Sequence, residues 1–536
     1  MLSRRTELVS EVDPTGATRA SPLNLLVNQW LPVRRRSGQL DTISPAQIAE
    51  NDDPAVALDW PRADFRIAAL EFLIGLLATA CPPKGARDWF DGWQVPPDAA
   101  TLDAAFAPLA HAFHLDGPGP RFLQDFEDLV SDAEPVERLL IDSPGASTLR
   151  QNTDLLVRRG RLADLGRPAA AMALFTFQSW APAGGAGNRT GLRGGGPMTT
   201  LVLPGDRPTL WQQVWANVPL GRPAEAEDLP RIFPWLVPNP SRDVVPEDVH
   251  PLQCWWGMPR RIRLDFAMAE APQACGLTGM PDAVQVRSWR QRPRGSNYIG
   301  WGKVHPLTPH YALKAGGEFL PLHPQPGGIG YRHWLGLVAA APDGLRLPGD
   351  SVATWRDERE VDSQVSARLL AAGYDMDNMK ARAFLESEMP LPARADDALA
   401  TRLVLSANQV AGLLRSAVRY ALFSAGATVK LDSELLSSLR ERLWEQTEAD
   451  FFRLLSQAPA DVSQRRLVRL RALALALFDE AAPLTPENGG AAPRISRARR
   501  NLVFALTGFG KEGAALFTTL GLPAAEAKAK KKGKAA

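Results

Sequence analysis

The sequence contains very little cysteine. Its three cysteines, Cys81, Cys254 and Cys275, are scattered through 536 residues. They are too few and too far apart for the disulfide framework of a secreted protein, and no CxxC pair exists to hold a metal. The composition therefore favours a protein of a reducing cytoplasm.

Long apolar runs are missing as well. The longest candidate, residues 68–80, contains Glu71 and ends at Cys81-Pro82-Pro83, which makes it unsuitable for spanning a bilayer. Residues 1–19 are polar and have no apolar signal core. We expect a cytoplasmic chain without a membrane partner.

The patterns of an active site are also absent. None of the seven histidines forms an HExxH or HxH motif with a carboxylate at metal spacing, and there is no GxSxG nucleophile motif. The sequence therefore predicts no catalytic residues, no metal and no cofactor. A DNA-processing nuclease is the enzyme alternative, and it would need a carboxylate or histidine cluster.

The sequence has almost no excess of positive over negative charge. The formal net charge is only +2, whereas a protein that binds nucleic acid alone is usually more basic. Local basic surfaces can still exist, so the positions of the arginines matter more than their number.

The length of the chain and its sequence patterns predict several domains. With 536 residues it is too long for one hydrophobic core. We expect a disordered extension over residues 1–22, an irregular mixed α/β domain over 23–390, a helical domain over 391–521 and a basic disordered tail over 522–536. Four amphipathic stretches, at about 398–424, 432–457, 460–482 and 493–518, predict a four-helix bundle. The predicted fold class is α+β.

One segment is rich in glycine. Residues 181–196 contain seven glycines, together with Arg189 and Arg193, whose positive charge suits an anionic ligand. Glycine lets the backbone approach a ligand closely, which suits contact with a nucleic-acid backbone. No Lys-Ser/Thr follows at the spacing of a Walker loop. A flexible surface loop explains the segment equally well.

Two further segments allow a structural or a functional interpretation. Residues 373–382 favour a turn before a helix that starts near Lys380, because Asn and Asp side chains bond their own backbone in turns. The functional alternative is a polar wedge at a nucleic-acid groove. Residues 290–294, Arg-Gln-Arg-Pro-Arg, lie near Tyr298 and Trp301, a combination that suits either nucleic-acid contact or a solvated turn.

The C-terminal domain carries arginines at helical spacing. Residues four apart share a helix face, which predicts basic faces. Cations at a helix N-terminus are unfavourable with the helix dipole, so a cluster there points to an anionic partner. A solvated polar face is the alternative. The arginines are Arg415 and Arg419, then Arg465, Arg466 and Arg469, and finally Arg494, Arg497, Arg499 and Arg500.

Several motifs resemble one family when they are read together. The glycine-rich segment with its flanks, Ala171–Thr176 and Pro197–Thr200, resembles the glycine-loop region of the CasA family, the large subunit of the type I-E CRISPR complex Cascade. The same resemblance extends to Leu23–Val33, Pro120–Gln124, Trp301–Pro309 and the four helical stretches. It covers the chain from about Leu23 to about Gly521.

The resemblance implies a non-catalytic DNA-binding subunit in a CRISPR RNA-guided antiviral complex. It implies recognition of the protospacer-adjacent motif (PAM) of double-stranded DNA, mainly from the minor groove, followed by local strand opening and R-loop formation. Base pairing with the guide reads the remaining sequence. The implied partners are the crRNA 5′ handle, the target duplex with its displaced strand, the backbone and small Cascade subunits, and the helicase-nuclease.

The resemblance also implies site residues. The minor-groove contact maps to Arg292, with Arg294 as the alternative, because the spacings to Trp301 and His305 disagree. The glycine loop maps to 183–189, with Gly184, Gly185, Gly187, Asn188 and Arg189 as DNA contacts; the wedge maps to Asp377, Asn378 and Met379; the crRNA contact maps to Leu156, Val157 and Arg158; and the displaced strand maps to Arg415, Arg419, Arg465, Arg466, Arg469, Arg497 and Arg500.

Two further expectations concern a structural zinc and the alternatives to a DNA-binding role. Some family members carry paired cysteines just after the crRNA-contacting loop, where this chain has Gly166-Arg167-Pro168-Ala169, so the sequence predicts no structural zinc. A pure scaffold, whose arginines bind only partner proteins, is the second alternative beside a nuclease.

Overall fold

The computed structural model describes residues 11–12, 18–19, 21–154, 157–185, 187–239, 241–359, 364–377, 379–423, 434–485 and 490–523. Within the expected extension 1–22, strands β1 (Glu11–Val12) and β2 (Thr18–Arg19) form a short antiparallel pair, and most of the other residues lie outside the described part. The expected basic tail falls outside it beyond residue 523.

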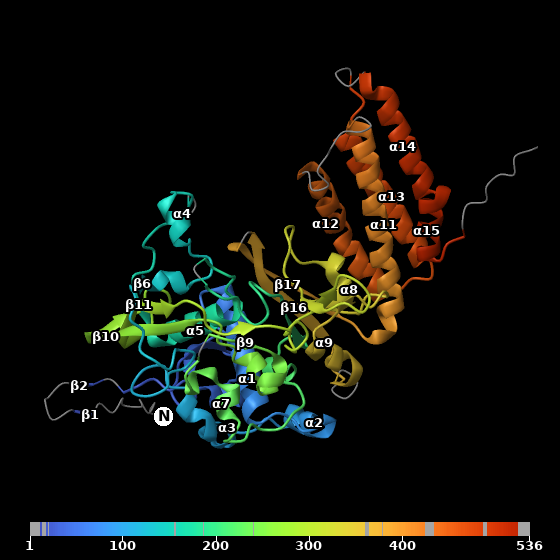
Figure 1. The fold of residues 1–536 in the computed structure, drawn as a ribbon. Helices are drawn as coiled ribbons and strands as arrows, with labels where there is room; N and C mark the ends of the chain where they lie inside the picture. Colours follow the sequence, from blue (N-terminus) through green and yellow to red (C-terminus); the bar gives the residue numbers. More distant parts are fainter. Residues whose placement is uncertain are drawn as a thin grey trace, which may run out of the picture. The chain divides into compact units, whose positions relative to one another are not determined.

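The chain divides into two compact units. The first contains residues 1–328 and 342–391, and the second contains 329–341 and 392–536. The sequence predicts a single boundary near residue 390, whereas the structure also groups the short segment 329–341 with the C-terminal helices. The predicted α+β fold class is confirmed (Figure 1).

The first unit is built around helix α1 (Ala63–Ala80), which is buried on nearly all sides. This helix is apolar all round, as a helix must be when other elements cover every face. Phe72 is the centre of an aromatic cluster and meets five neighbouring rings edge-on. The other helices of this unit are α2 (Ala86–Gln94), α3 (Ala99–Phe106), α4 (Ala146–Arg150), α5 (Arg167–Trp180), α6 (Leu210–Trp215), α7 (Leu229–Ile232) and α9 (Asp350–Thr354).

Small sheets surround this core; most of their strand pairs are antiparallel, while β9 pairs with β12 in parallel. The longest ladders are the β10–β11 hairpin and the sheet ordered β17-β16-β8. The strands are β3 (Leu31–Arg35), β4 (Leu40–Ile43), β5 (Ala55–Leu58), β6 (Glu134–Pro135), β7 (Leu165–Gly166), β8 (Thr199–Pro204), β9 (Asp243–Val244), β10 (Arg261–Ala274), β11 (Pro281–Arg292), β12 (Asn297–Tyr298), β13 (His310–Ala312), β14 (Phe319–Pro321), β15 (Arg346–Leu347), β16 (Ala367–Asp377) and β17 (Lys380–Leu391).

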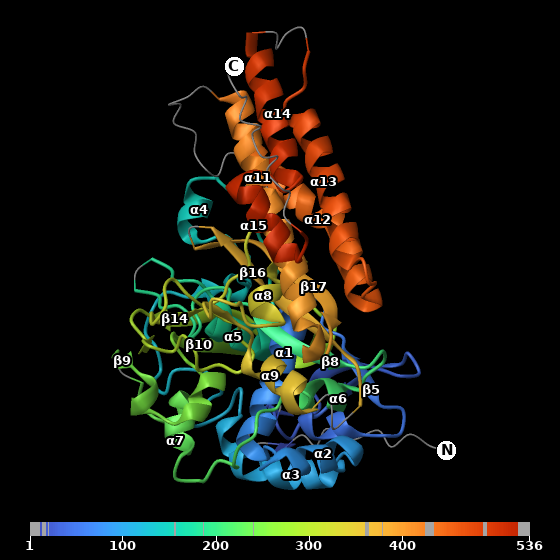
Figure 2. The same cartoon turned by 90° about the vertical axis from the view of Figure 1, so that its right-hand side faces the viewer.

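The second unit is helical, and its long helices run side by side (Figure 2). The stretch predicted as one helix over 493–518 is two helices, because Gly508 and Gly510 have φ values of +89° and +76°, which a right-handed helix cannot contain. The helices are α8 (Trp334–Leu337), α11 (Asp397–Leu422), α12 (Glu434–Gln457), α13 (Val462–Ala481), α14 (Ala492–Leu506) and α15 (Gly510–Leu520).

Segment 329–341 belongs to this unit because its aromatic residues fill the helical core. The Tyr331 ring stacks on Phe451 at 4.6 Å, and its hydroxyl lies 2.6 Å from the Thr447 hydroxyl. Trp334 packs edge-on against the same Phe451 at 5.2 Å. Within the described residues, no helix has the length and apolar character needed to cross a membrane.

Candidate nucleic-acid interface

The tip of the glycine-rich segment is an exposed, tightly turned loop. The Gly184 amide donates a hydrogen bond to the Asn188 carbonyl at 3.3 Å, and the Asn188 side chain donates to the Gly185 carbonyl at 3.1 Å. Gly184, Gly185 and Gly187 are exposed, while Asn188 and Arg189 are half-buried. The tip therefore presents bare backbone to the surface, which is the property that a ligand-contacting loop needs.

The base of the same segment uses glycine for packing. A Cβ atom on Gly191 would lie 2.1 Å from the Ser179 carbonyl oxygen, and one on Gly196 would lie 2.8 Å from the Tyr374 Cβ atom. Any larger residue would push these backbones apart. The glycine content thus has two causes, exposure at the tip and close packing at the base.

Arg193 is not available to a ligand, so its interpretation as part of a positively charged loop is wrong. It is buried, and its Nη2 atom lies 2.5 Å from Oε1 of the buried Glu71. His305 Nε2 lies 3.5 Å from the same oxygen. Burial alone would raise the pKa of Glu71, but Arg193 and His305 hold it at about 2. Burial and the Arg193 charge lower the pKa of His305 to about 4, so this histidine is neutral at pH 7.

This ionic network anchors the base of the glycine segment to α1. Sequence analysis missed it, although one signal was present. Glu71 lies inside an otherwise apolar helical run, and a buried carboxylate needs a buried cation or several donors. The identity of the cation, Arg193, depends on long-range packing.

Arg260 supports the glycine loop from the inside. Its Nε atom donates to the Arg189 carbonyl at 3.0 Å, and a second nitrogen donates to the Pro182 carbonyl. The guanidinium also lies over the Phe177 ring at 4.4 Å. Burial lowers the pKa of Arg260 to about 10, so it remains charged at neutral pH. Arg260 therefore fixes both ends of the loop through backbone oxygens.

The basic segment 290–294 meets the glycine loop directly. The Arg294 amide donates to the Gly187 carbonyl at 3.0 Å, and a Cβ atom on Gly187 would lie 3.0 Å from the Arg294 Cγ atom. Arg292 and Arg294 are both exposed. Two segments distant in the sequence thus form one surface of open backbone and positive charge.

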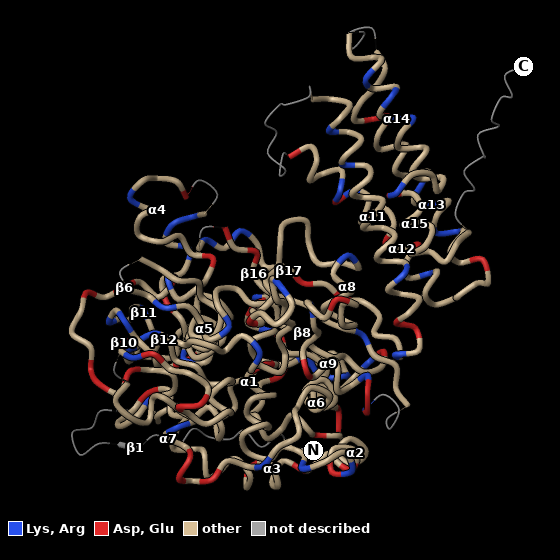
Figure 3. The backbone as a smooth tube through the Cα atoms, turned by 45° about the vertical axis from the view of Figure 1, so that its right-hand side comes forward, with Lys and Arg blue, Asp and Glu red and all other residues tan. Residues whose placement is uncertain are grey.

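Most arginines around this surface have acidic partners. Arg290 Nε lies 3.2 Å from Asp265, and Arg292 Nη1 lies 3.4 Å from Glu127. Figure 3 shows basic and acidic stretches of the backbone interleaved around β10, β11 and β12. Sequence analysis did not single out Glu127, although it lies in the run Asp125-Phe126-Glu127-Asp128.

Two of the predicted wedge residues, Asp377 and Met379, lie at the tip of the β16–β17 hairpin. Asp377 pairs with Lys380 in the ladder, and Met379 is 61% exposed with φ +66°. Asn378 lies outside the described residues. The predicted helix starting near Lys380 is wrong, because Lys380–Leu391 forms strand β17 along the whole length of β16. Asp377 is opposite Lys380, so the two strands stay paired up to the tip of the hairpin.

The hairpin is anchored to the start of α1. The Tyr374 hydroxyl donates to Asp64 at 2.5 Å, and Arg62 Nη2 lies 2.8 Å from the same carboxylate. Arg382 pairs with Asp375 at 2.7 Å across the hairpin. A cavity of about 260 Å³ beside this base is lined by Arg62, Asp64, Tyr374 and Arg382, together with Asp142. The tip therefore extends from a firmly held base.

The predicted crRNA-contacting loop is partly described. Arg158 is exposed and Val157 half-buried, while Leu156 lies outside the described residues. The loop is held by Arg159, which pairs with Asp154 at 2.6 Å, and by Arg161, which pairs with Asp142 at 2.9 Å. Arg158 is thus presented to the surface from a braced loop.

The bundle arginines differ from one another. Arg466 is fully buried and pairs with Asp450 at 3.3 Å, so its assignment to a basic surface is wrong. The Tyr331 hydroxyl accepts a hydrogen bond from the buried Arg466 guanidinium at 2.8 Å. Arg499 is paired with Asp479 at 2.6 Å. The arginines that are at least partly exposed, as expected, are Arg415, Arg419, Arg465, Arg469, Arg497 and Arg500.

The architecture and the sequence both match known proteins. A model of the CRISPR-associated protein Cse1 family matches residues 24–481, which is most of the chain. The chain belongs to the Cse1 family. Since Cse1 and CasA are two names for one protein in a Thermus thermophilus structure, the resemblance to the CasA family is confirmed.

Solved Cse1 structures share this fold. Thermobifida fusca Cse1 has a TM-score of 0.65 at 17% identity, with 93% of this chain and 98% of that chain covered. CasA of Thermus thermophilus has a TM-score of 0.64 at 17% identity, with 90% and 99% covered. A chain from a CRISPR RNA-guided surveillance complex has a TM-score of 0.66 at 17% identity, with 90% and 99% covered.

One region of the Cse1 fold is held by ion pairs in this chain. Gly166 lies beside Cys275, and a Cβ atom on it would be 3.4 Å from the cysteine Cβ atom. Arg167 pairs with Asp282 at 2.8 Å and with Asp116 at 3.2 Å. Among the described residues, no group of three or more His, Cys, Asp or Glu side chains is placed to hold a metal ion.

Proposed function

We propose that this chain is the PAM-reading subunit of a CRISPR RNA-guided DNA surveillance complex. The observation that carries the proposal is the contact between Gly187 and Arg294, which joins an exposed backbone loop to exposed arginines. An open glycine loop can lie against a groove floor or phosphates, while Arg292 or Arg294 enters the minor groove. The degenerate pattern of that groove suits tolerance of several related motifs.

The β16–β17 hairpin supplies the wedge in this proposal. Its tip carries the exposed Met379 beside Asn378, and an apolar side chain inserted between base steps unstacks them. A firm base at Tyr374 and Arg62 lets the tip act on the duplex without folding back. Opening next to the motif would let guide pairing begin and the R-loop form.

The remaining contacts follow the same scheme. Residues 156–158 contact the crRNA 5′ handle and the neighbouring backbone subunit. The exposed bundle arginines Arg415, Arg419, Arg465, Arg469, Arg497 and Arg500 guide the displaced strand, and the small subunits lie beside it. The chain itself is non-catalytic and provides the docking surface for the helicase-nuclease.

The test uses the reconstituted complex on guide-matched duplexes whose flanking positions are randomised. We compare the complex with the wild-type chain, without the chain, with Asn378→Ala plus Arg292→Ala, and with Arg34→Ala as a surface-arginine control. The double variant should lose motif-dependent duplex binding yet bind pre-opened target, while Arg34→Ala behaves as wild type. Equal enrichment of motifs without the chain, or with the double variant, would favour the scaffold alternative.

A further inference from the structure

Four arginines share one face of the β10–β11 hairpin. In the antiparallel register, Arg261 is opposite Arg292 and Arg263 is opposite Arg290. Residues two apart on a strand point to the same side, so the four positive charges lie close together. Like charges directly opposite one another are destabilising unless anions lie between them.

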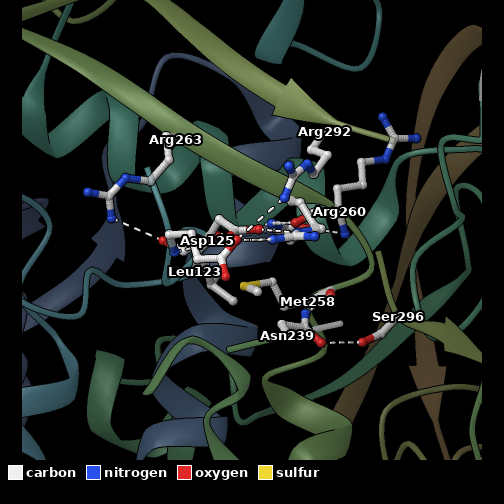
Figure 4. Close-up of polar contacts among 11 residues, drawn as sticks. Leu123, Asp125, Asn239, Met258, Arg260, Arg263, Arg292 and Ser296 are labelled. Carbon is white, nitrogen blue, oxygen red and sulfur yellow. Dashed lines mark hydrogen bonds and ion pairs between the residues drawn. The ribbon is translucent and has the colours of Figure 1, made fainter. Parts of the chain in front are cut away.

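A short acidic segment, Asp125–Asp128, supplies those anions, and Figure 4 shows Asp125 near Arg263 and Arg292. Asp125 pairs with Arg261, and Glu127 bridges Arg261 at 3.1 Å and Arg292 at 3.4 Å. Asp128 pairs with Arg263 at 2.7 Å. The segment therefore lies along the arginine face as a row of carboxylates.

The three carboxylates differ in exposure. The side chain of Asp125 is 0% exposed, whereas those of Glu127 and Asp128 are 53% and 93% exposed. Asp125 is thus part of the folded core, and its ion pair with Arg261 does not depend on what binds at the surface. Glu127 holds Arg292, itself 58% exposed, from the solvent side. A phosphate would approach Arg292 from that same side.

Carboxylates and phosphates compete for a guanidinium because both accept its N–H donors in similar geometry. Binding to DNA of arbitrary sequence comes almost entirely from phosphate contacts. A fixed carboxylate next to Arg292 must be displaced before that arginine can neutralise a phosphate. The chain's small net charge is consistent with such internal pairing of its arginines.

We propose that Glu127 limits motif-independent DNA binding by occupying Arg292 until a motif-bearing duplex displaces it. The inference rests on the proposed function, because it requires Arg292 to face DNA. It assigns a role to an acidic residue beside the proposed DNA-contacting arginines. That role depends on the ion pair between Glu127 and Arg292.

The test is a double-mutant cycle of Glu127→Gln and Arg292→Ala in the reconstituted complex. The probe is duplex DNA without a match to the guide, titrated at several salt concentrations. Glu127→Gln should strengthen binding about two- to fivefold, the range that one exposed ion pair supports. It should also steepen the salt slope by about 0.9, because one more phosphate is neutralised. In the Arg292→Ala background, the same substitution should change nothing.

Asp59→Asn is the matched control, because it breaks the exposed pair of Arg34 with Asp59, 2.7 Å apart in the β3–β5 region. It should leave binding unchanged. An equal gain from Glu127→Gln with and without Arg292 would mean simple repulsion between Glu127 and DNA and would overturn the proposal. If Arg292→Ala leaves motif-dependent binding intact, the proposed function fails at this residue. If Arg292→Ala weakens it but Glu127→Gln has no effect, only this inference fails.

Discussion

The Gly187 carbonyl accepts a hydrogen bond from the Arg294 amide at 3.0 Å, and the Arg294 Cγ atom lies 3.0 Å from the place that a Gly187 Cβ atom would take. Loop and arginine therefore depend on each other's position. Gly187 also has φ +82°, a conformation that other L-residues adopt at a cost. By contrast, Gly185 has open space around its Cα atom.

Gly187→Ala should lower the free energy of unfolding by about 1–2 kcal/mol, the cost of a left-handed conformation, and should also displace Arg294. Motif-dependent duplex binding by the complex should weaken. Gly185→Ala should leave the free energy of unfolding unchanged. Thermal denaturation of the chain and titration with duplex DNA measure the two effects, and equal behaviour of the two variants would contradict this account of the loop.

Arg465 and Arg466 are neighbours in the sequence with different surroundings. Arg466→Ala should destabilise the helical unit by about 3–5 kcal/mol, because Asp450 and the Tyr331 hydroxyl lose a buried cation. Arg465→Ala removes an exposed pair with Asp461 and should cost far less, because solvent screens that pair. Urea denaturation of the two variants measures the difference. Similar costs would show that Arg466 is not buried as described.

His305 should make the first unit less stable in acid. Its pKa falls from 6.5 to about 4 on folding, because burial and the Arg193 charge disfavour the imidazolium. The unfolded chain thus binds more protons between these values, and stability is lost as the pH falls. Between pH 7 and pH 5 we expect a loss of about 2 kcal/mol from this residue. Glu71, with a pKa of about 2, loses its contribution only at lower pH.

Urea denaturation at the two pH values measures this loss, and His305→Gln provides the comparison. The variant is expected to be less stable at pH 7 but to lose less stability on acidification. An unchanged difference between pH 7 and pH 5 in the variant would rule out His305 as the source.

A substitution of Met379 should affect the stability and the function of the hairpin tip in different ways. Its φ of +66° is strained for methionine, so Met379→Gly should keep or raise the free energy of unfolding by about 1 kcal/mol. The same change removes the exposed apolar side chain, so opening of a motif-bearing duplex should slow. A base-analogue fluorophore next to the motif reports opening. A variant that opens duplex at the wild-type rate would exclude Met379 from the wedge.

The sequence by itself determined much of the local structure. The amphipathic stretches after residue 390 required a helical unit, although the structure divides the last stretch into two helices at Gly508 and Gly510. Ordered motifs along the chain indicated the family, because a family resemblance needs only the order and spacing of residues.

The tertiary structure decided which charges are available. Arg466 and Arg193 look like surface arginines in the sequence, yet Tyr331 and Glu71 bury them from distant positions. Glu127 becomes relevant only because it lies against Arg292. The free energy of a charged side chain depends on its exposure and on its partner, and both are set by contacts between residues far apart in the chain.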